Sequence, residues 1–326
     1  MYDVVALGEL LVDFTPYGNS EHNNPCFERN PGGGPANMAC TIGKLGGKVA
    51  FLSQVGNDMF GQALKKIVEQ ENVDCSQVRL TNDYKTTLAF VGLDEMGERS
   101  FSFYRKYGAD TMMKVEDYDL SILEKTKYFF LSSVLMAEGT SRETSFQLLE
   151  KAKQVGVPIV FDPNVRFNLW EKEEELKECI FKTLEYANIV KVSDEELIYL
   201  MGSEEENASY HIEKYANTMR EQYNIDILLV TGGKNGCVAY TEKGSIEHKG
   251  FIVEKPVDTT AAGDSFTGGF LRMLSSLNKP YNQCSLEEMK HCITVGNAVG
   301  SLTVQKRGAI SALPTWEEVE QRMSLM

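Results

Sequence analysis

The feature that most constrains the fold of this 326-residue chain is an alternation of two hydrophobic patterns. Short apolar runs bounded by Gly or Pro are separated by longer segments in which apolar residues recur with helical periodicity. Strands buried on both faces are apolar throughout, and their alternation with helices is typical of a parallel sheet covered by helices. The sequence therefore predicts an α/β fold with a mostly parallel central sheet. Strands are expected at 3–8, 48–53, 127–132, 157–162, 188–192 and 226–231. Helices are expected at 36–45, 60–71, 140–155, 171–186, 194–201, 207–222, 264–277, 286–303 and 315–323.

Two segments, 11–30 and 86–106, depart from this pattern because their apolar residues alternate with polar ones. Such alternation is typical of a sheet with one face exposed to solvent. We expect these segments to form a small β-sheet that projects from a main α/β domain comprising 1–10, 31–85 and 107–326. The sheet could close over a cleft as a lid. The alternative is a pair of surface hairpins without a function.

The charge and cysteine content narrow the class of protein. A formal net charge of −14, from 33 Lys and Arg against 47 Asp and Glu, argues against a nucleic acid or an anionic membrane as partner. The longest apolar run, residues 128–136, is too short to cross a bilayer. Seven irregularly spaced cysteines without a Cys-x-x-Cys pair indicate reduced thiols in a cytoplasmic protein. The four histidines are scattered, so they indicate no metal cluster and are expected at the surface.

The segment from Asp258 to Asp264, with the sequence DTTAAGD, leads directly into a helical pattern. Its small residues would let the backbone N–H groups of 261–264 point at one place, and a helix N-terminus adds partial positive charge there. Such a corner binds anions, and Asp264 could accept a proton from a hydroxyl that attacks a phosphate. Phosphoryl transfer needs this combination. The alternative is an ordinary aspartate cap on a Gly-rich turn, and this segment alone does not separate the two.

A second glycine-rich segment, GGGPAN at 32–37, precedes the helix expected at 36–45. Its glycines would let a ligand approach the backbone closely, and Asn37 offers both a donor and an acceptor to a hydroxyl. The segment is not a dinucleotide fingerprint, and the chain lacks the Gly-x-x-x-x-Gly-Lys-[Ser/Thr] phosphate loop. By itself the segment is more typical of a tight turn than of a site. A third Gly-rich turn, at 231–236, follows the last expected strand, and by itself it is equally weak evidence for a binding site.

Polar residues also follow several of the expected strands. Asp13 comes after the first strand, DPNVR at 162–166 after the fourth, and KVSDEE at 191–196 after the fifth. Ligands of open α/β sheets bind at these strand ends. Ser193 and Glu196 have the spacing of a capping box, so a purely structural role for Glu196 is a strong alternative to a role in binding.

These elements, in this order, resemble the ribokinase-like (PfkB) family of carbohydrate kinases over essentially the whole chain. Its two most diagnostic patches are both present: Gly33 to Asn37, with Gly43 and Gly56 downstream, and Asp258 to Asp264, with Gly268 and Gly269. Within the family the chain is most similar to fructokinases. The segments that carry this similarity are 6–14, 56–61, 87–91, 98–105 and 162–170. The resemblance implies a three-layer ribokinase-like fold with the projecting sheet as a lid over the sugar site.

The resemblance also implies roles for individual residues. Asp264 would be the catalytic base, and the N–H groups of Ala261, Ala262 and Gly263 would form the anion hole. Residues that would contact the sugar or the transferred phosphate are Asp13, Gly33, Gly34, Asn37, Tyr104, Arg105 and Arg166. Residues that would line the ATP site are Lys191, Ser193, Thr231, Gly233, Gly236 and Asn297. Glu196 would organise Mg²⁺ through water, and Asp258 and Thr260 would belong to a monovalent-cation site for K⁺.

The chain departs from the family pattern at two positions. The family usually has glycine where Ala261 stands, and alanine keeps its N–H donation if its φ is negative. The motif that carries the metal-organising acid usually begins with asparagine, whereas this chain has Ser193. The second departure weakens the case for Glu196 in metal binding, although the acid itself is present.

The reaction implied by the resemblance is ATP-dependent phosphorylation of D-fructose to fructose 6-phosphate. One alternative is a 2-keto-3-deoxygluconate kinase, in which Arg105 and Arg166 would clamp the substrate carboxylate. Another is a different sugar kinase or a nucleoside kinase of the same family. A non-enzymatic sugar-binding regulator is disfavoured because a pure binder needs no base at Asp264. The expected partners are small molecules, and the exposed face of the projecting sheet could pair with a second copy in a homodimer or close over the sugar alone.

Overall fold

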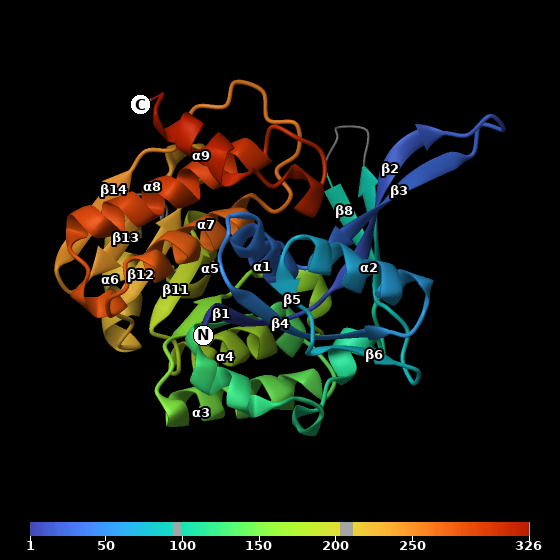
Figure 1. The fold of residues 1–326 in the computed structure, drawn as a ribbon, viewed down its shortest axis with the longest axis horizontal. Coiled ribbons are helices and arrows are strands. Elements are labelled where there is room, and N and C mark those ends of the chain that lie inside the picture. The colour runs from blue at the N-terminus through green and yellow to red at the C-terminus, as the bar shows by residue number, and fades with distance from the viewer. Residues whose placement is uncertain (94–98, 203–210, 326) are drawn as a thin grey trace.

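The computed structural model describes residues 1–93, 99–202 and 211–325. Its centre is a ten-stranded sheet with the order β14-β13-β12-β11-β10-β9-β1-β4-β5, with β6 paired to β4 (Figure 1). Every neighbouring pair from β12 to β5 is parallel, whereas β13 and β14 are antiparallel additions at one edge. The strands are β1 (Tyr2–Leu7), β4 (Val49–Gly56), β5 (Val73–Asp74), β6 (Val78–Thr81), β9 (Thr126–Ser132), β10 (Ile159–Asp162), β11 (Ile189–Ser193), β12 (Ile227–Thr231), β13 (Cys237–Thr241) and β14 (Gly244–His248).

Helices cover both faces of this sheet because each central strand is apolar on both sides. In β1, Val5 and Leu7 belong to a core shared with α3 to α6, whereas Val4 and Ala6 belong to a core shared with α1, α2, α7 and α8. The helices are α1 (Gly34–Lys44), α2 (Met59–Gln70), α3 (Ser141–Val155), α4 (Glu173–Leu184), α5 (Asp194–Met201), α6 (Ile212–Gln222), α7 (Ala262–Ser276), α8 (Leu286–Thr303) and α9 (Trp316–Met323). The predicted three-layer α/β architecture is confirmed.

The sequence pattern located the helices better than the sheet edge. Each expected helix is present, although the first residues of the helix expected at 207–222 lie outside the described residues. The strands β5, β6, β13 and β14 toward the edges of the sheet were not predicted, because runs of two to five residues carry too little periodicity to be recognised. The expectation that all histidines lie at the surface is wrong for His248, which ends β14 and is 8% exposed.

A separate four-stranded sheet projects from the main body, as Figure 1 shows. Its strands, in the order β3-β2-β7-β8, are β2 (Leu11–Asn19), β3 (Pro25–Gly32), β7 (Leu88–Leu93) and β8 (Arg99–Tyr104). The β2–β7 pair is parallel and the other two pairs are antiparallel. The alternating segments therefore form one small sheet, as predicted, and we call it the lid sheet.

The two faces of the lid sheet differ in chemistry. One face carries Phe14 stacked on Phe90 at a ring-centroid distance of 4.8 Å, with Phe27 and Tyr104 edge-on to Phe90. The opposite face presents Asp13 and other polar residues toward the body. This division follows from the two-residue period of a strand, which sends successive side chains to opposite faces.

The structure describes the length and polarity of the helices and the state of the cysteines. No helix among the residues 1–93, 99–202 and 211–325 is long and apolar enough to cross a membrane. All seven cysteines are free thiols, and six of them are buried.

Candidate active site

Asp264 lies near the N-terminus of α7 and faces the start of α1. The side-chain amide Nδ2 of Asn37 donates a hydrogen bond of 2.9 Å to Asp264 Oδ2. A Cβ atom at Gly34 would lie 3.2 Å from Asp264 Oδ1 and 2.6 Å from Asn164 Nδ2. The absence of a side chain at position 34 thus lets the segments 32–37 and 258–264 meet around one half-buried carboxylate.

The turn that starts α1 requires glycine at position 33. Gly33 has φ of 116°, a region that residues with a side chain rarely adopt. A Cβ atom there would also approach the main-chain oxygen of Glu9 to 2.3 Å. The structure therefore explains the glycines of this segment by backbone geometry and by close approach to Glu9 and Asp264.

The N-terminus of α7 provides the N–H groups that were expected to form an anion hole. Gly263 and Asp264 belong to the first helical turn, where N–H groups have no carbonyl partner within the helix. The N–H of Ala262, in contrast, donates to Thr259 O at 3.3 Å. The N–H groups of Gly263 and Asp264 are therefore available to bind an anion at this corner, whereas the N–H of Ala262 already has a partner.

The backbone of Ala261 does not have the conformation that the sequence analysis required for N–H donation. Its φ is +60°, in the left-handed region, whereas the expectation required a negative φ. The residue is the N-cap of α7, and the turn from Asp258 onward imposes the conformation that glycine would adopt without strain.

Replacement of Ala261 by Gly is expected to stabilise the fold by up to about 1.5 kcal/mol. The left-handed conformation costs an L-residue roughly 1–2 kcal/mol, and the extra backbone entropy of glycine in the unfolded chain offsets about 0.5–1 kcal/mol of the gain. Urea unfolding measures this difference. Ala262→Gly is the matched control, because Ala262 lies inside the helix and loses roughly 0.5–1 kcal/mol. Equal destabilisation of the two variants would contradict the assignment of strain to Ala261.

A buried ion pair lies beside the N-terminus of α7. Lys191 Nζ on β11 is 3.2 Å from Asp162 Oδ2 at the end of β10, and both side chains are almost fully buried. Burial alone would lower the pKa of Lys191, but the negative charges of Asp162, Glu196 and Asp264 outweigh it and raise the pKa. Burial raises the pKa of Asp162 to about 6, although the Lys191 cation opposes this shift. Lys191 is therefore held as a cation.

The ammonium group of Lys191 approaches the backbone of α7 closely. Its Nζ lies 3.1 Å from the position that a Cβ atom of Gly263 would occupy. A positive charge and the first-turn N–H groups of α7 thus converge on one place, which is the arrangement that stabilises negative charge on a transferring phosphoryl group.

Glu196 forms the capping box that the sequence offered as the structural alternative. Ser193 Oγ accepts from Glu196 N at 3.0 Å, and Glu196 Oε2 accepts from Ser193 N at 2.8 Å. Glu196 Oε1 accepts from Val165 N at 2.8 Å, which ties the loop after β10 to α5. No group of three or more His, Cys, Asp or Glu side chains suited to a metal occurs among the described residues.

A cavity of about 420 Å³ opens on one side of this corner. It is lined by Thr231, Gly233, Gly236, Phe251, Gly263 and Asn297, among others. Four of the six residues expected at the ATP site, Thr231, Gly233, Gly236 and Asn297, therefore share one cavity with the start of α7, whereas Lys191 and Ser193 do not line it. Asn297 Nδ2 donates to His248 O at 3.0 Å and lies 3.0 Å from His248 Nδ1. His248 is a contact that the sequence did not indicate.

A second cavity, of about 240 Å³, lies between the lid sheet and the body. Its lid side includes Asp13, Glu28 and Asn30, and its body side includes Asp258 and Arg307. Burial raises the pKa of Asp13 to about 6, the Arg166 cation opposes the shift, and Asp264 adds to it. The negative charge of Asp264 therefore acts on Asp13, although Asp264 itself does not line this cavity.

Four residues assigned to the sugar or to a cation have other partners. Arg105 is buried in an ion pair with Asp110, and Tyr104 is 70% exposed on the aromatic face of the lid sheet. Asp258 Oδ1 accepts from the N–H and hydroxyl groups of Thr260, and its Oδ2 accepts from Gly308 N. The structure therefore does not bring Arg105 and Tyr104 to Asp264.

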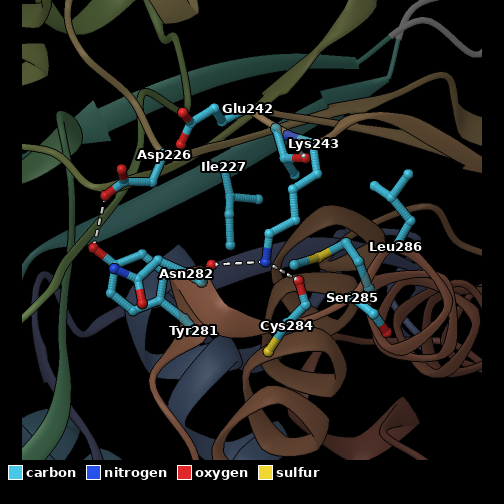
Figure 2. Close-up of a pocket in the computed structure, with 11 residues that line it drawn as sticks. Asp226, Ile227, Glu242, Lys243, Tyr281, Asn282, Cys284, Ser285 and Leu286 are labelled. Atoms are coloured by element: carbon cyan, nitrogen blue, oxygen red, sulfur yellow. Dashed lines mark hydrogen bonds between the residues drawn. The ribbon is translucent and has the colours of Figure 1, made fainter.

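A smaller cavity, of about 40 Å³, lies at the amino end of β12, away from the strand ends that form the candidate site. Figure 2 shows Lys243 Nζ donating to the main-chain oxygens of Asn282 and Cys284, at 3.0 and 2.8 Å. The hydroxyl of Tyr281 donates to Asp226 Oδ2 at 2.7 Å. Lys243, the lysine that lines this cavity, therefore already binds main-chain carbonyl groups. None of the predicted site residues lines the cavity.

An aspartate at a helix N-terminus lies beside a buried cation and between two cavities, one of which the lid sheet borders. This combination is typical of an enzyme that transfers a phosphoryl group to an alcohol. The chain belongs to the pfkB family of carbohydrate kinases, whose model matches residues 1–316. It is 36% identical over 326 residues to probable fructokinase-7 of Arabidopsis thaliana, covering 98% of this chain and 92% of that protein.

Solved structures agree with this assignment. Fructokinase from Vibrio cholerae O395 in a fructose-, ADP- and calcium-bound form has a TM-score of 0.86 at 32% identity, and the match covers 98% of both chains. Fructokinase from Xylella fastidiosa with bound ATP has a TM-score of 0.85 at 30% identity, covering 100% of this chain and 99% of that one. The predicted family and fold are confirmed.

Proposed function

We propose that this carbohydrate kinase transfers the γ-phosphoryl group of ATP to the 6-hydroxyl of D-fructose. The single observation that carries the proposal is the Asn37–Asp264 hydrogen bond of 2.9 Å, which fixes a carboxylate beside the N-terminus of α7. The relatives and the neighbouring structures named as fructokinases support the choice of sugar.

In the proposed mechanism Asp264 accepts the proton of the attacking hydroxyl. The N–H groups of Gly263 and Asp264 and the ammonium group of Lys191 stabilise the charge on the transferred phosphoryl oxygens. ATP occupies the cavity lined by Thr231, Gly236 and Asn297. Fructose occupies the cavity beside Asp13, where an ionised carboxylate accepts hydrogen bonds from sugar hydroxyls.

The chain fits Mg²⁺ as an ion held mainly by ATP and by water. Asp162 and Glu196 are the acids nearest to Lys191, but Glu196 already accepts two backbone N–H bonds and Asp162 pairs with Lys191. Mg²⁺ commonly keeps several waters and few protein ligands in such sites. When bound, the ion neutralises charge on the phosphates. We extend the proposal to K⁺ near Asp258 and Thr260, where the two side chains already form a tight turn.

The lid sheet, comprising strands within 11–32 and 88–104, is proposed to close over the sugar and exclude water from the reaction. Its aromatic face leaves Phe27 46% exposed and Tyr104 70% exposed, and we propose that this face pairs with a second copy in a homodimer. The free cysteines and the use of ATP favour the cytoplasm as the working compartment.

A coupled assay of ADP release with Mg²⁺ and ATP tests the function. We expect fructose to be the preferred acceptor over 2-keto-3-deoxygluconate, because the guanidinium of Arg105 is paired with Asp110 and cannot clamp a carboxylate. The same assay with and without K⁺ measures the cation requirement. A higher kcat/KM for the keto acid, or for a nucleoside, would overturn the choice of fructose.

A further inference from the structure

The chain segments that connect the lid sheet to the body converge on one buried polar cluster. The link between β1 and β2 contributes Glu9, and the junction of β3 with α1 contributes Gly34. The residue before β7 is Thr87, and the residue after β8 is Arg105. The side chains of Glu9, Thr87 and Arg105 are at most 3% exposed. The root of the lid sheet is therefore a polar site inside the protein.

Arg105 is the cation of this cluster. Its Nε and Nη2 atoms donate to Asp110 Oδ2 at 2.9 and 2.8 Å, and its Nη1 atom donates to Val134 O at 3.0 Å. The hydroxyl of Thr87 donates to the other oxygen of Asp110. Asp110, in the short 3₁₀ helix Ala109–Met112, thus joins the entry to β7 and the exit from β8.

Glu9 joins the remaining two segments. Its Oε1 atom accepts a hydrogen bond of 2.8 Å from Gly34 N, at the first residue of α1. The N-cap residue Gly33 has no side chain to cap this helix, so Glu9 supplies a carboxylate to the helix N-terminus from a distant segment. Its Oε2 atom is buried and has no hydrogen-bond partner among the described residues.

The helix held by Glu9 carries part of the catalytic site. Asn37, one turn after Gly34, donates to Asp264 Oδ2, and Gly34 itself lies against Asp264 Oδ1. A shift of the α1 N-terminus would therefore displace both groups that contact the proposed base. Misplacement of a catalytic group by about 1 Å can cost on the order of 10²-fold in rate.

The charges around Glu9 make its ionisation sensitive to pH. Burial raises the pKa of Glu9 to about 7; the Arg105 cation opposes this shift and Asp110 adds to it. With Glu9 ionised, Asp110, Glu9 and Glu138 all place negative charge on Arg105, whereas a proton on Glu9 removes one of these charges and leaves the Asp110–Arg105 ion pair in place. The other acids near the site with raised pKa values, Asp13 and Asp162, titrate lower, at about 6.

We propose that Glu9 is a positioning residue whose carboxylate fixes the N-terminus of α1, and through Asn37 the catalytic base, to the root of the lid sheet. The inference rests on the proposed kinase function. A charged acceptor binds an N–H group more strongly than a neutral one does. Protonation of Glu9 therefore loosens α1 and lowers activity without unfolding the protein.

Glu9→Gln tests the proposal because it keeps the size of the side chain and removes the charge. At pH 8 we expect kcat/KM for fructose to fall roughly tenfold, the difference between a charge-assisted and a neutral hydrogen bond. The KM for ATP should stay within about twofold. Wild-type kcat/KM should rise through an ionisation near pH 7, and Glu9→Gln should lack this ionisation while keeping the one at lower pH.

Thermal melting provides a readout that a merely structural role would not give. Because the folded-state pKa of Glu9 lies above its ordinary 4.5, the folded protein binds the proton more tightly than the unfolded chain does. The contribution of Glu9 to the free energy of unfolding therefore falls as the pH rises from about 4.5 to about 7. At pH 8 the Tm of Glu9→Gln should equal or exceed that of the wild type, although its activity is lower.

Glu69→Gln, at an exposed acid of α2, is the control and should change neither the pH profile nor the Tm. The proposal is overturned if Glu9→Gln keeps wild-type kcat/KM at pH 8. It is equally overturned if activity and Tm at pH 8 fall together. Absence of fructose turnover in the wild type would instead refute the choice of sugar, and the pH dependence of the Tm would still test the buried carboxylate.

Discussion

Asp264→Asn is expected to lower kcat for fructose about 10²–10⁴-fold, the usual contribution of a general base. The substitution keeps the shape of the side chain and one oxygen that can accept from Asn37 Nδ2. It removes only the ability to take the proton of the attacking hydroxyl. Because Asp264 itself does not line the cavity proposed for ATP, we expect little change in the KM for ATP. Steady-state kinetics with both substrates measure this separation.

Asp264→Ala is the companion variant, since it also removes the acceptor of the Asn37 hydrogen bond. If proton transfer is the main role of Asp264, the two variants should have similar kcat values. A far larger loss in the alanine variant would instead assign the effect to the placement of α1. Unchanged turnover in Asp264→Asn would remove the residue from the chemistry altogether.

The residues of this site differ in how far the sequence alone could predict them. The two segments of glycine and other small residues stand out in the sequence, but only the family resemblance favoured a site over a tight turn there. Gly33 and Gly34 indeed allow contacts that a Cβ atom would prevent. The backbone angle of Ala261 could not be predicted, because the surrounding turn and not the alanine itself determines it. Tertiary context decides such conformations.

Buried charges were the least predictable part of the site. Glu9 and Asp110 are among 47 acidic residues, and nothing in the local pattern distinguishes a buried acid from a solvated one. The family resemblance assigned Arg105 to the substrate, whereas the fold pairs it with Asp110. Charge pairs across distant segments depend on the strand order, which becomes known only when the sheet is assembled.

Replacement of Lys191 by Met is expected to lower kcat about 10²–10³-fold, as the loss of one preorganised donor does in other enzymes. The variant should also lose stability, because Asp162 would remain buried without its cation. Breaking a buried pair in this way typically costs about 3–5 kcal/mol. Since burial already places the pKa of Asp162 above its ordinary value, the folded protein favours the protonated acid, and the deficit should be larger at pH 8 than at pH 5.

The double variant Lys191→Met with Asp162→Asn separates the two effects. A neutral amide at position 162 removes the unpaired charge, so most of the lost free energy of unfolding should return, as measured by urea denaturation. The loss in kcat should persist, because the ammonium group near Gly263 is still absent. Recovery of turnover together with stability would show that Lys191 acts only as the partner of Asp162. Persistent inactivity in a stable double variant would place its charge among the groups that stabilise the transferred phosphoryl group.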